Sequence, residues 1–128
     1  MQDRFISVLL VGTGGFFGAV ARYLVGVVMP FLVGGFPYAT MLVNLVGCII
    51  IGLLSELALT SHMISSELRL LLVAGFCGGF TTFSSYMFEI MAMLRDGAVF
   101  TASIYLSGSI LGGMLCLYLG ILLARAIV

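Results

Sequence analysis

The chain has 128 residues, of which 62% are hydrophobic and only 8% are charged, and its formal net charge at pH 7 is zero. A soluble globular domain is far less apolar than this, so that class is excluded, and the balanced charge gives no reason to expect a nucleic-acid partner. The sequence contains no nucleotide-binding P-loop motif, so transport driven by ATP is not expected either. The length suits one membrane domain that covers residues 1–128.

Four apolar stretches are each long enough to cross a lipid bilayer, which takes about 20 residues. They cover residues 5–29, 38–59, 68–94 and 98–123. Continuous apolar runs without alternation favour helices over a β-barrel. The connections are short, which forces successive helices to lie antiparallel, and the first of them (30–37) reads as a turn on its prolines and glycines. We therefore expect an all-α integral membrane protein with four transmembrane helices.

The positive side chains are all arginine and say little about orientation. With four spans, Arg4, Arg69 and Arg125 fall on one side of the membrane, and Arg22 and Arg95 fall on the other. This three-to-two split gives almost no positive-inside signal. Two interpretations fit it: a single, weakly specified topology, or insertion in both orientations, which would allow an antiparallel homodimer.

Small residues recur four positions apart in three of the spans. Such pairs let helix backbones approach closely inside a membrane, so we expect them at helix contacts. The pairs are Gly14 with Gly18, Gly75 with Gly79, and Gly108 with Gly112.

The second span carries Thr40 and Asn44, four residues apart and therefore on one face of a helix. An asparagine within a span either bonds a neighbouring helix or binds something that crosses the membrane, and both interpretations stay open. Glu56 and Glu89 lie towards the ends of their spans, where we expect them at the wetted interface. Ser66 is expected to cap the third helix.

The third span is interrupted at residues 75–86, which read GFCGGFTTFSSY. Gly78 and Gly79 weaken a helix, and the hydroxyl side chains that follow compete for the backbone groups released there. Two structures fit this pattern. One is a true break whose free carbonyls bind a hard cation, and the other is a gently kinked helix.

The fourth span repeats the step of four with Thr101, Tyr105, Ser109 and Gly113. Three helices thus present neutral donors inside the membrane. Amide and hydroxyl hydrogens donate to anions, and the edges of aromatic rings, here Phe80, Phe83 and Tyr86, carry partial positive charge. This combination suits a small anion.

The segments GFCGGFTTFSSYMFE, GGFFGAVARY and TMLVNLVG together resemble the Fluc/CrcB family of fluoride channels. The first segment is highly specific, and the similarity runs over all four spans in order. The resemblance implies an antiparallel, dual-topology homodimer with two fluoride pores between the subunits. It also implies a structural sodium ion, held by the backbone carbonyls of Gly78 and Thr81 from both subunits.

The resemblance also implies individual pore residues. Asn44 matches the pore asparagine, and Phe83 matches the first of two pore phenylalanines. Tyr86 stands where the second is expected, and Gly113 stands where a further hydroxyl is expected, so conductance can differ from the family pattern. With the polar stripes, the predicted fluoride pathway comprises Thr40, Asn44, Phe83, Tyr86, Tyr105 and Ser109.

We therefore expect a passive fluoride channel of the bacterial inner membrane, and not an enzyme. Hydrogen fluoride enters a cell as a neutral acid and dissociates inside, and a membrane potential that is negative inside drives the anion out. The alternative is a small dual-topology, proton-coupled multidrug transporter, which predicts a glutamate in the first span and usually tryptophan. The chain has neither. A scaffold subunit without transport would leave the polar stripes without a role.

Overall fold

The computed structural model describes residues 2–29 and 35–128, whose regular secondary structure is entirely helical, with no strand among them. Three spans are continuous: α1 (Gln2–Val28), α2 (Tyr38–Thr60) and α6 (Val99–Ile127). The third span consists of α3 (Ser66–Arg69), the π-helix η2 (Leu70–Cys77), α4 (Gly78–Phe80) and α5 (Phe83–Arg95). All four spans are long and apolar enough to cross a membrane. The predicted all-α membrane fold with a broken third span is confirmed.

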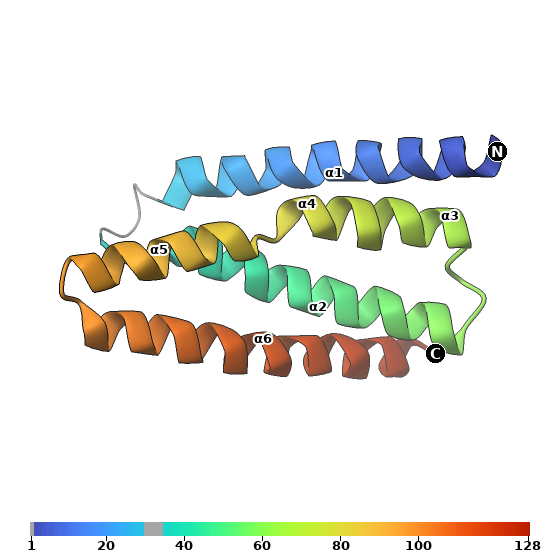
Figure 1. Cartoon of the computed structure of the whole chain (residues 1–128). Helices are drawn as coiled ribbons and strands as arrows, with labels where there is room; N and C mark the ends of the chain where they lie inside the picture. The colour runs from blue at the N-terminus through green and yellow to red at the C-terminus, as the bar shows by residue number, and fades with distance from the viewer. Residues whose placement is uncertain (1, 30–34) are drawn as a thin grey trace.

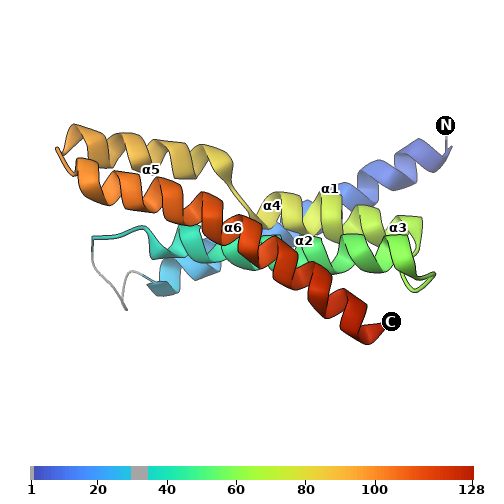
Figure 2. The same ribbon diagram turned by 90° about the horizontal axis from the view of Figure 1, so that it is seen from below.

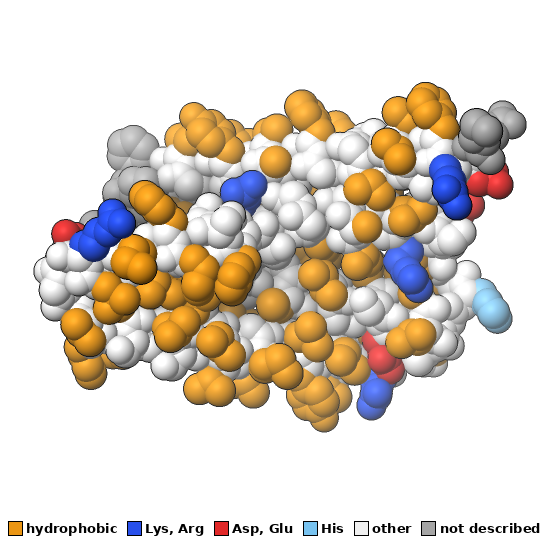
Figure 3. All heavy atoms as spheres, in the orientation of Figure 1, with side chains coloured by type: hydrophobic (Ala, Val, Ile, Leu, Met, Phe, Trp, Pro, Cys, Tyr) orange, Lys and Arg blue, Asp and Glu red, His pale blue; other side chains and the backbone are white. Residues whose placement is uncertain are grey.

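Successive spans run in opposite directions, so α1 lies parallel to the third span and α2 lies parallel to α6 (Figure 1). α1 packs along η2 and α4, whereas α6 packs along α2 and α5. Figure 2 shows that the chain leaves α4 in an extended segment before α5 begins, and that both termini lie at the same end of the bundle. Most of the charged side chains on the face in Figure 3 lie towards the two ends, with hydrophobic side chains between them. This distribution suits a lipid environment.

Glycines set the contact between α1 and the first half of the third span. A Cβ atom at Gly14 would collide with the carbonyl oxygen of Leu71, and one at Gly18 would collide with that of Phe76. A Cβ at Gly79 would likewise strike the backbone of α1. The two backbones therefore touch directly, as the spacing of small residues predicts.

A second set of glycines joins α2 to α6. A Cβ at Gly52 would collide with the carbonyl oxygen of Leu117, and one at Gly120 with a carbonyl of α2. Gly108 and Gly112, which the spacing singled out, face side chains of α2 rather than its backbone. Their flexible neighbours leave more room, so the closest approach of these two helices lies further along α6 than predicted.

The start of the third span differs from the prediction by one residue. Ser65, not Ser66, is the cap: its backbone is extended, and its hydroxyl accepts a hydrogen bond of 3.2 Å from the Leu68 N–H. Ser66 already has helical geometry, and a capping residue must lie outside the helix. The prediction for Ser66 was therefore wrong.

The turn between α5 and α6 needs its glycine. Gly97 has φ +77°, and the N–H of Ala98 bonds the carbonyl of Met93 at 2.9 Å. This pattern closes a helix with a left-handed residue, a conformation that glycine adopts without steric cost. The first predicted connection, 30–37, falls largely outside the described residues.

Candidate functional site

The third span is broken at Thr81 and Thr82, both of which have extended backbone geometry. The Thr82 hydroxyl accepts the Ser85 N–H at 3.3 Å and so starts α5 as an N-terminal cap. Of the two structures that the sequence left open, the chain therefore adopts the true break and not the kink. Such a break inside a membrane leaves backbone groups that other parts of the protein must satisfy.

Asn44 of α2 satisfies one residue of the break completely. Its Nδ2 donates to the Thr82 carbonyl at 3.0 Å, and its Oδ1 accepts the Thr82 N–H at 2.8 Å. The amide thus replaces both hydrogen bonds that a continuous helix would have supplied. One Nδ2 hydrogen remains for another acceptor, because a primary amide carries two.

The side chain of Arg22 in α1 satisfies a second backbone group near the break. Its Nε donates to the Gly79 carbonyl at 3.0 Å. In the sequence this arginine is placed only by its position near the end of a span, whereas the structure ties it to the break. A charged residue within a span is by default a functional candidate, and that rule identifies it.

The carbonyls of Gly78 and Thr81 lose the donors that a continuous helix would give them. The Thr82 N–H, four residues after Gly78, donates to Asn44 instead. The Ser85 N–H, four residues after Thr81, donates to the Thr82 hydroxyl. Gly78 is exposed on the chain, and a Cβ there would meet nothing within 4 Å. These two carbonyls remain candidates for a ligand.

A polar cluster lies beyond the break, where α2, α5 and α6 meet. Glu89 of α5 accepts one hydrogen bond from the Thr40 hydroxyl at 2.5 Å and another from the Tyr105 hydroxyl at 2.6 Å. Thr40 and Tyr105 were both predicted pathway residues, and the structure brings them together. Glu89 was expected at the wetted interface, but it is half-buried between the two hydroxyls. The same rule for charged residues in spans would have identified it.

Aromatic rings line the side of this cluster that faces the break. The ring of Tyr86 stands edge-on to Tyr105, with centroids 5.0 Å apart and planes at 78°. Phe83 follows at 6.1 Å from Tyr86, and its side chain is 72% exposed on the single chain. The Ser109 hydroxyl is buried without a hydrogen-bond partner among the described residues.

The predicted pathway residues thus fall into two groups. Thr40, Tyr86 and Tyr105 lie around Glu89, with Ser109 on the same helix as Tyr105, whereas Asn44 bonds the break itself. Phe83 points outward, so on one chain it encloses nothing.

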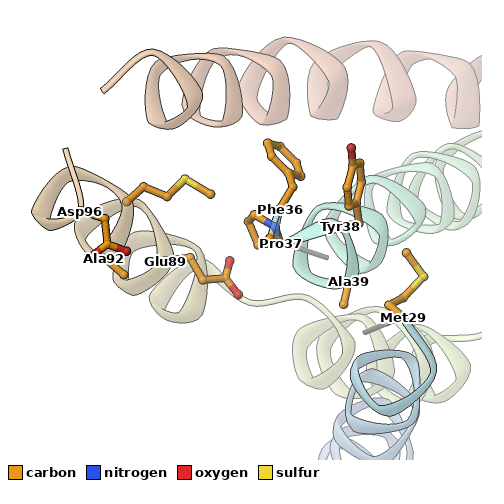
Figure 4. Close-up of a pocket in the computed structure, with 10 residues that line it drawn as sticks. Met29, Phe36, Pro37, Tyr38, Ala39, Glu89, Ala92 and Asp96 are labelled. Carbon is orange, nitrogen blue, oxygen red and sulfur yellow. The ribbon is translucent and has the colours of Figure 1, made fainter. Parts of the chain in front are cut away.

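Two cavities adjoin Glu89 from different sides. The first, about 460 Å³, lies between the end of α1, the start of α2 and the end of α5 (Figure 4). Its lining includes Phe36, Pro37 and Asp96, and in Figure 4 the Glu89 carboxylate points across it. The second, about 350 Å³, is lined by Arg22, Thr82 and Ser85 among others.

The two cavities differ in charge. The first has the carboxylates of Glu89 and Asp96 and no basic residue in its lining, whereas the second has the guanidinium of Arg22 together with the carboxylate of Glu89. In the described part of the chain the only ion pair joins Arg125 to Glu56, at 2.8 Å, so Arg22 has no paired carboxylate there. The carboxylates of the first cavity repel anions, whereas Arg22 in the second offsets the charge of Glu89. Of the two cavities, the second is therefore the better entrance for an anion.

Comparison with known proteins shows which family the sequence resembles. Residues 9–121 match the family described as "CrcB-like protein, Camphor Resistance (CrcB)". A "Fluoride-specific ion channel FluC" from Prosthecochloris aestuarii is 64% identical over 98% of both chains, and one from Chlorobium phaeobacteroides is 59% identical over the same shares. A protein of that name from Geobacter metallireducens is 41% identical over 94% of this chain and 98% of its own.

Proposed function

The chain belongs to the CrcB family, and from this premise we propose that it is a fluoride-selective channel, through which fluoride leaves the cell down its electrochemical gradient. It is a multi-pass protein of the inner membrane and not an enzyme. The observation that carries the proposal is the set of neutral donors and edge-on rings near the break, beside a cavity that Arg22 lines.

Fluoride must lose water to pass, and the site offers replacements for it. Arg22 raises the local concentration of anions in the second cavity, and the free Nδ2 hydrogen of Asn44 and the Ser109 hydroxyl can donate to the ion. The ring edges of Phe83 and Tyr86 add partial positive charge. No group on this path needs to change covalently, so flow is passive and follows the membrane potential.

The hydrogen bonds that Glu89 accepts explain how its carboxylate can lie beside the path of an anion. Its oxygens accept from Thr40 and Tyr105, so both hydroxyls already point their hydrogens at a negatively charged acceptor. Fluoride is an acceptor of the same kind. The carboxylate therefore holds these donors in the orientation that the ion requires, and a shift of its side chain makes them available.

The functional unit is an antiparallel homodimer with two pathways between the subunits. Three features support this part of the proposal. Phe83 and Gly78 are exposed on the single chain although they lie at the break, and the arginines give almost no orientation signal. A second copy related by a twofold axis would cover both residues and would let Phe83 face the pathway of its partner.

A sodium ion with a structural role lies between the two copies. The carbonyls of Gly78 and Thr81 suit it, because their helical donors are diverted and hard cations prefer oxygen ligands. Among the described residues no three His, Cys, Asp or Glu side chains gather into a metal site, so carbonyl oxygens are the fitting ligands. When bound, the ion would screen these oxygens from one another at the dimer axis.

The test is fluoride efflux from liposomes that contain only the purified protein. We expect efflux driven by an imposed potential, with chloride retained under the same potential. Protein-free liposomes control for leakage of hydrogen fluoride. Efflux no faster than this leakage would overturn the proposed channel. Efflux that requires a proton gradient would favour a coupled transporter instead.

Topology and sodium are tested separately from conduction. A tag on the C-terminus should be accessible from both faces of the cell membrane, and accessibility from one face only would contradict the antiparallel dimer. Dimers purified without sodium or lithium should dissociate more readily than those in sodium. Equal stability in both solutions would remove sodium from the proposal.

A further inference from the structure

Two residues of α2 contact the break in the third span from the same side. Asn44 and Gly47 are three residues apart and therefore lie on one face of α2. The amide of Asn44 exchanges two hydrogen bonds with the backbone of Thr82. Gly47 is buried, and a Cβ atom there would collide with the Cγ2 methyl of Thr81. The Thr81 methyl therefore occupies the space that a side chain at position 47 would fill.

The hydrogen bonds of Asn44 also set the direction of the Thr81 carbonyl. This carbonyl and the Thr82 N–H belong to one planar trans peptide unit, in which they point in opposite directions. Because the N–H donates to the Oδ1 atom of Asn44 at 2.8 Å, the carbonyl points away from this asparagine. The direction of a candidate cation ligand thus depends on how closely the break lies against α2.

The side chain of Thr81 is held through both its hydroxyl and its methyl. The hydroxyl donates to the Cys77 carbonyl at 2.8 Å, and the same oxygen accepts the Thr81 N–H at 3.0 Å. The methyl and the hydroxyl turn together about χ1, so the methyl cannot leave Gly47 unless the hydroxyl leaves Cys77. A side chain at position 47 would therefore cost this hydrogen bond or push Thr81 away from α2.

We propose that Gly47 is a positioning residue for the sodium site, because its missing side chain lets the break lie close enough to α2 for Asn44 to direct the Thr81 carbonyl. This inference rests on the sodium ion and the dimer of the proposed function. A cation held by carbonyl oxygens depends on the direction of each one. In a twofold dimer, a substitution at Gly47 would disturb a ligand from each subunit at once. Gly47 therefore acts on the ion through Thr81.

Moving one methyl group across this contact tests the inference. Gly47→Ala adds a methyl where that of Thr81 lies, and Thr81→Ser removes the Thr81 methyl but keeps its hydroxyl and carbonyl. The readout is the sodium concentration at which half of the purified protein is dimeric, with a large organic cation replacing sodium at constant ionic strength. In Gly47→Ala this midpoint should rise at least about tenfold, the effect of losing one hydrogen bond to a charge.

The double variant and a matched control make this test specific. In Gly47→Ala with Thr81→Ser, the sodium midpoint should return to within about threefold of the wild-type value, because the two methyl groups no longer compete. Gly12→Ala adds the same methyl at a position where a Cβ meets nothing within 4 Å, so the midpoint should not change.

Three results would overturn the inference. An unchanged sodium midpoint in Gly47→Ala would show that Thr81 turns aside without redirecting its carbonyl. Loss of folded dimer to the same extent at every sodium concentration would show a packing defect, since a weakened site recovers when more ion is added. A double variant as impaired as Gly47→Ala would show that the two methyl groups do not compete. Wild-type dimers indifferent to sodium would overturn the sodium site and this inference with it, whereas efflux from liposomes tests the channel separately.

Discussion

The two halves of the third span belong to one apolar stretch of the sequence, but they pack on their neighbouring helices through different kinds of contact. The half before the break packs on α1 through glycines, so that backbone meets backbone, and among the side chains that the structure describes only Arg22, at the break, forms a hydrogen bond between the two. The half after the break packs on α6 through Tyr86, Glu89 and Tyr105. Tight, dry contact thus fixes one half, and the polar contact of the other half remains available to an ion.

This difference predicts that substitutions before the break damage the fold, and that substitutions after it damage conduction. The largest effect is expected for Gly18→Val, because its side chain would collide with the Phe76 carbonyl, which cannot move aside. We expect a loss of more than about 3 kcal/mol of stability. Thermal unfolding and gel filtration in detergent would measure it.

The control for this variant is Gly12→Val in the same helix. A Cβ at Gly12 meets nothing within 4 Å, so the variant should fold as the wild type does. Equal destabilisation of both variants would show that helix propensity, rather than the contact between α1 and the third span, decides the outcome.

Asn44→Asp tests the break between the two halves of the third span and should abolish most of the fluoride conduction. The carboxylate keeps an acceptor for the Thr82 N–H but places a second one against the Thr82 carbonyl, where the amide now donates. It also removes the donor proposed for fluoride. We expect efflux to fall at least about tenfold, the effect of losing a charge-affected hydrogen bond. Undiminished efflux in a folded variant would assign Asn44 to helix packing.

Gly78→Val tests the comparison further, because this glycine neighbours Gly79 but a Cβ there would meet nothing within 4 Å. A valine should leave the single chain folded and weaken the dimer by obstructing the shared site. We expect the dimer dissociation constant to rise at least about tenfold, which is about 1.4 kcal/mol. Dissociation on dilution would measure it, with Thr81→Ser, which keeps the carbonyl, as the mild control.

Glu89→Gln should have the smallest effect of the four. The amide retains one oxygen for Thr40 or Tyr105 but turns a donor towards the other hydroxyl. Efflux should fall about threefold to fivefold while thermal stability stays near that of the wild type. A loss of folded protein instead would show that the cluster is structural and that the polar half is not separate from the packing of the bundle.

The sequence predicts the fold well because its main signals are local. Apolar length and the low helix propensity of Gly78 and Gly79 define four spans and a break, and the step of four between Gly14 and Gly18 identifies the contact with the third span. Gly52 and Gly120 are not paired by spacing within one helix, so their contact across α2 and α6 could not be read in this way.

The candidate site is predicted only in part, because its hydrogen bonds join residues far apart in the chain. Thr40 and Tyr105 were identified by their stripes, but the partner that unites them, Glu89, lies on a third helix. Arg22 bonds a carbonyl 57 residues away. Such bonds depend on how helices cross, which no periodicity within a single span reveals.

The π-helix η2 has a consequence for how the length of this protein can vary. Each turn of a π-helix holds an extra residue compared with an α-helix, since its bonds reach five residues rather than four. Deleting one residue from Leu70–Cys77 would let the backbone close into an ordinary α-helix with every hydrogen bond made. Ser65 and α3 would keep nearly the same direction relative to Gly79, because five residues of a π-helix and four residues of an α-helix turn through almost the same angle. The wide turns therefore absorb a residue without a change of rotational phase, whereas a deletion in an ordinary α-helix would rotate one end about 100° relative to the other.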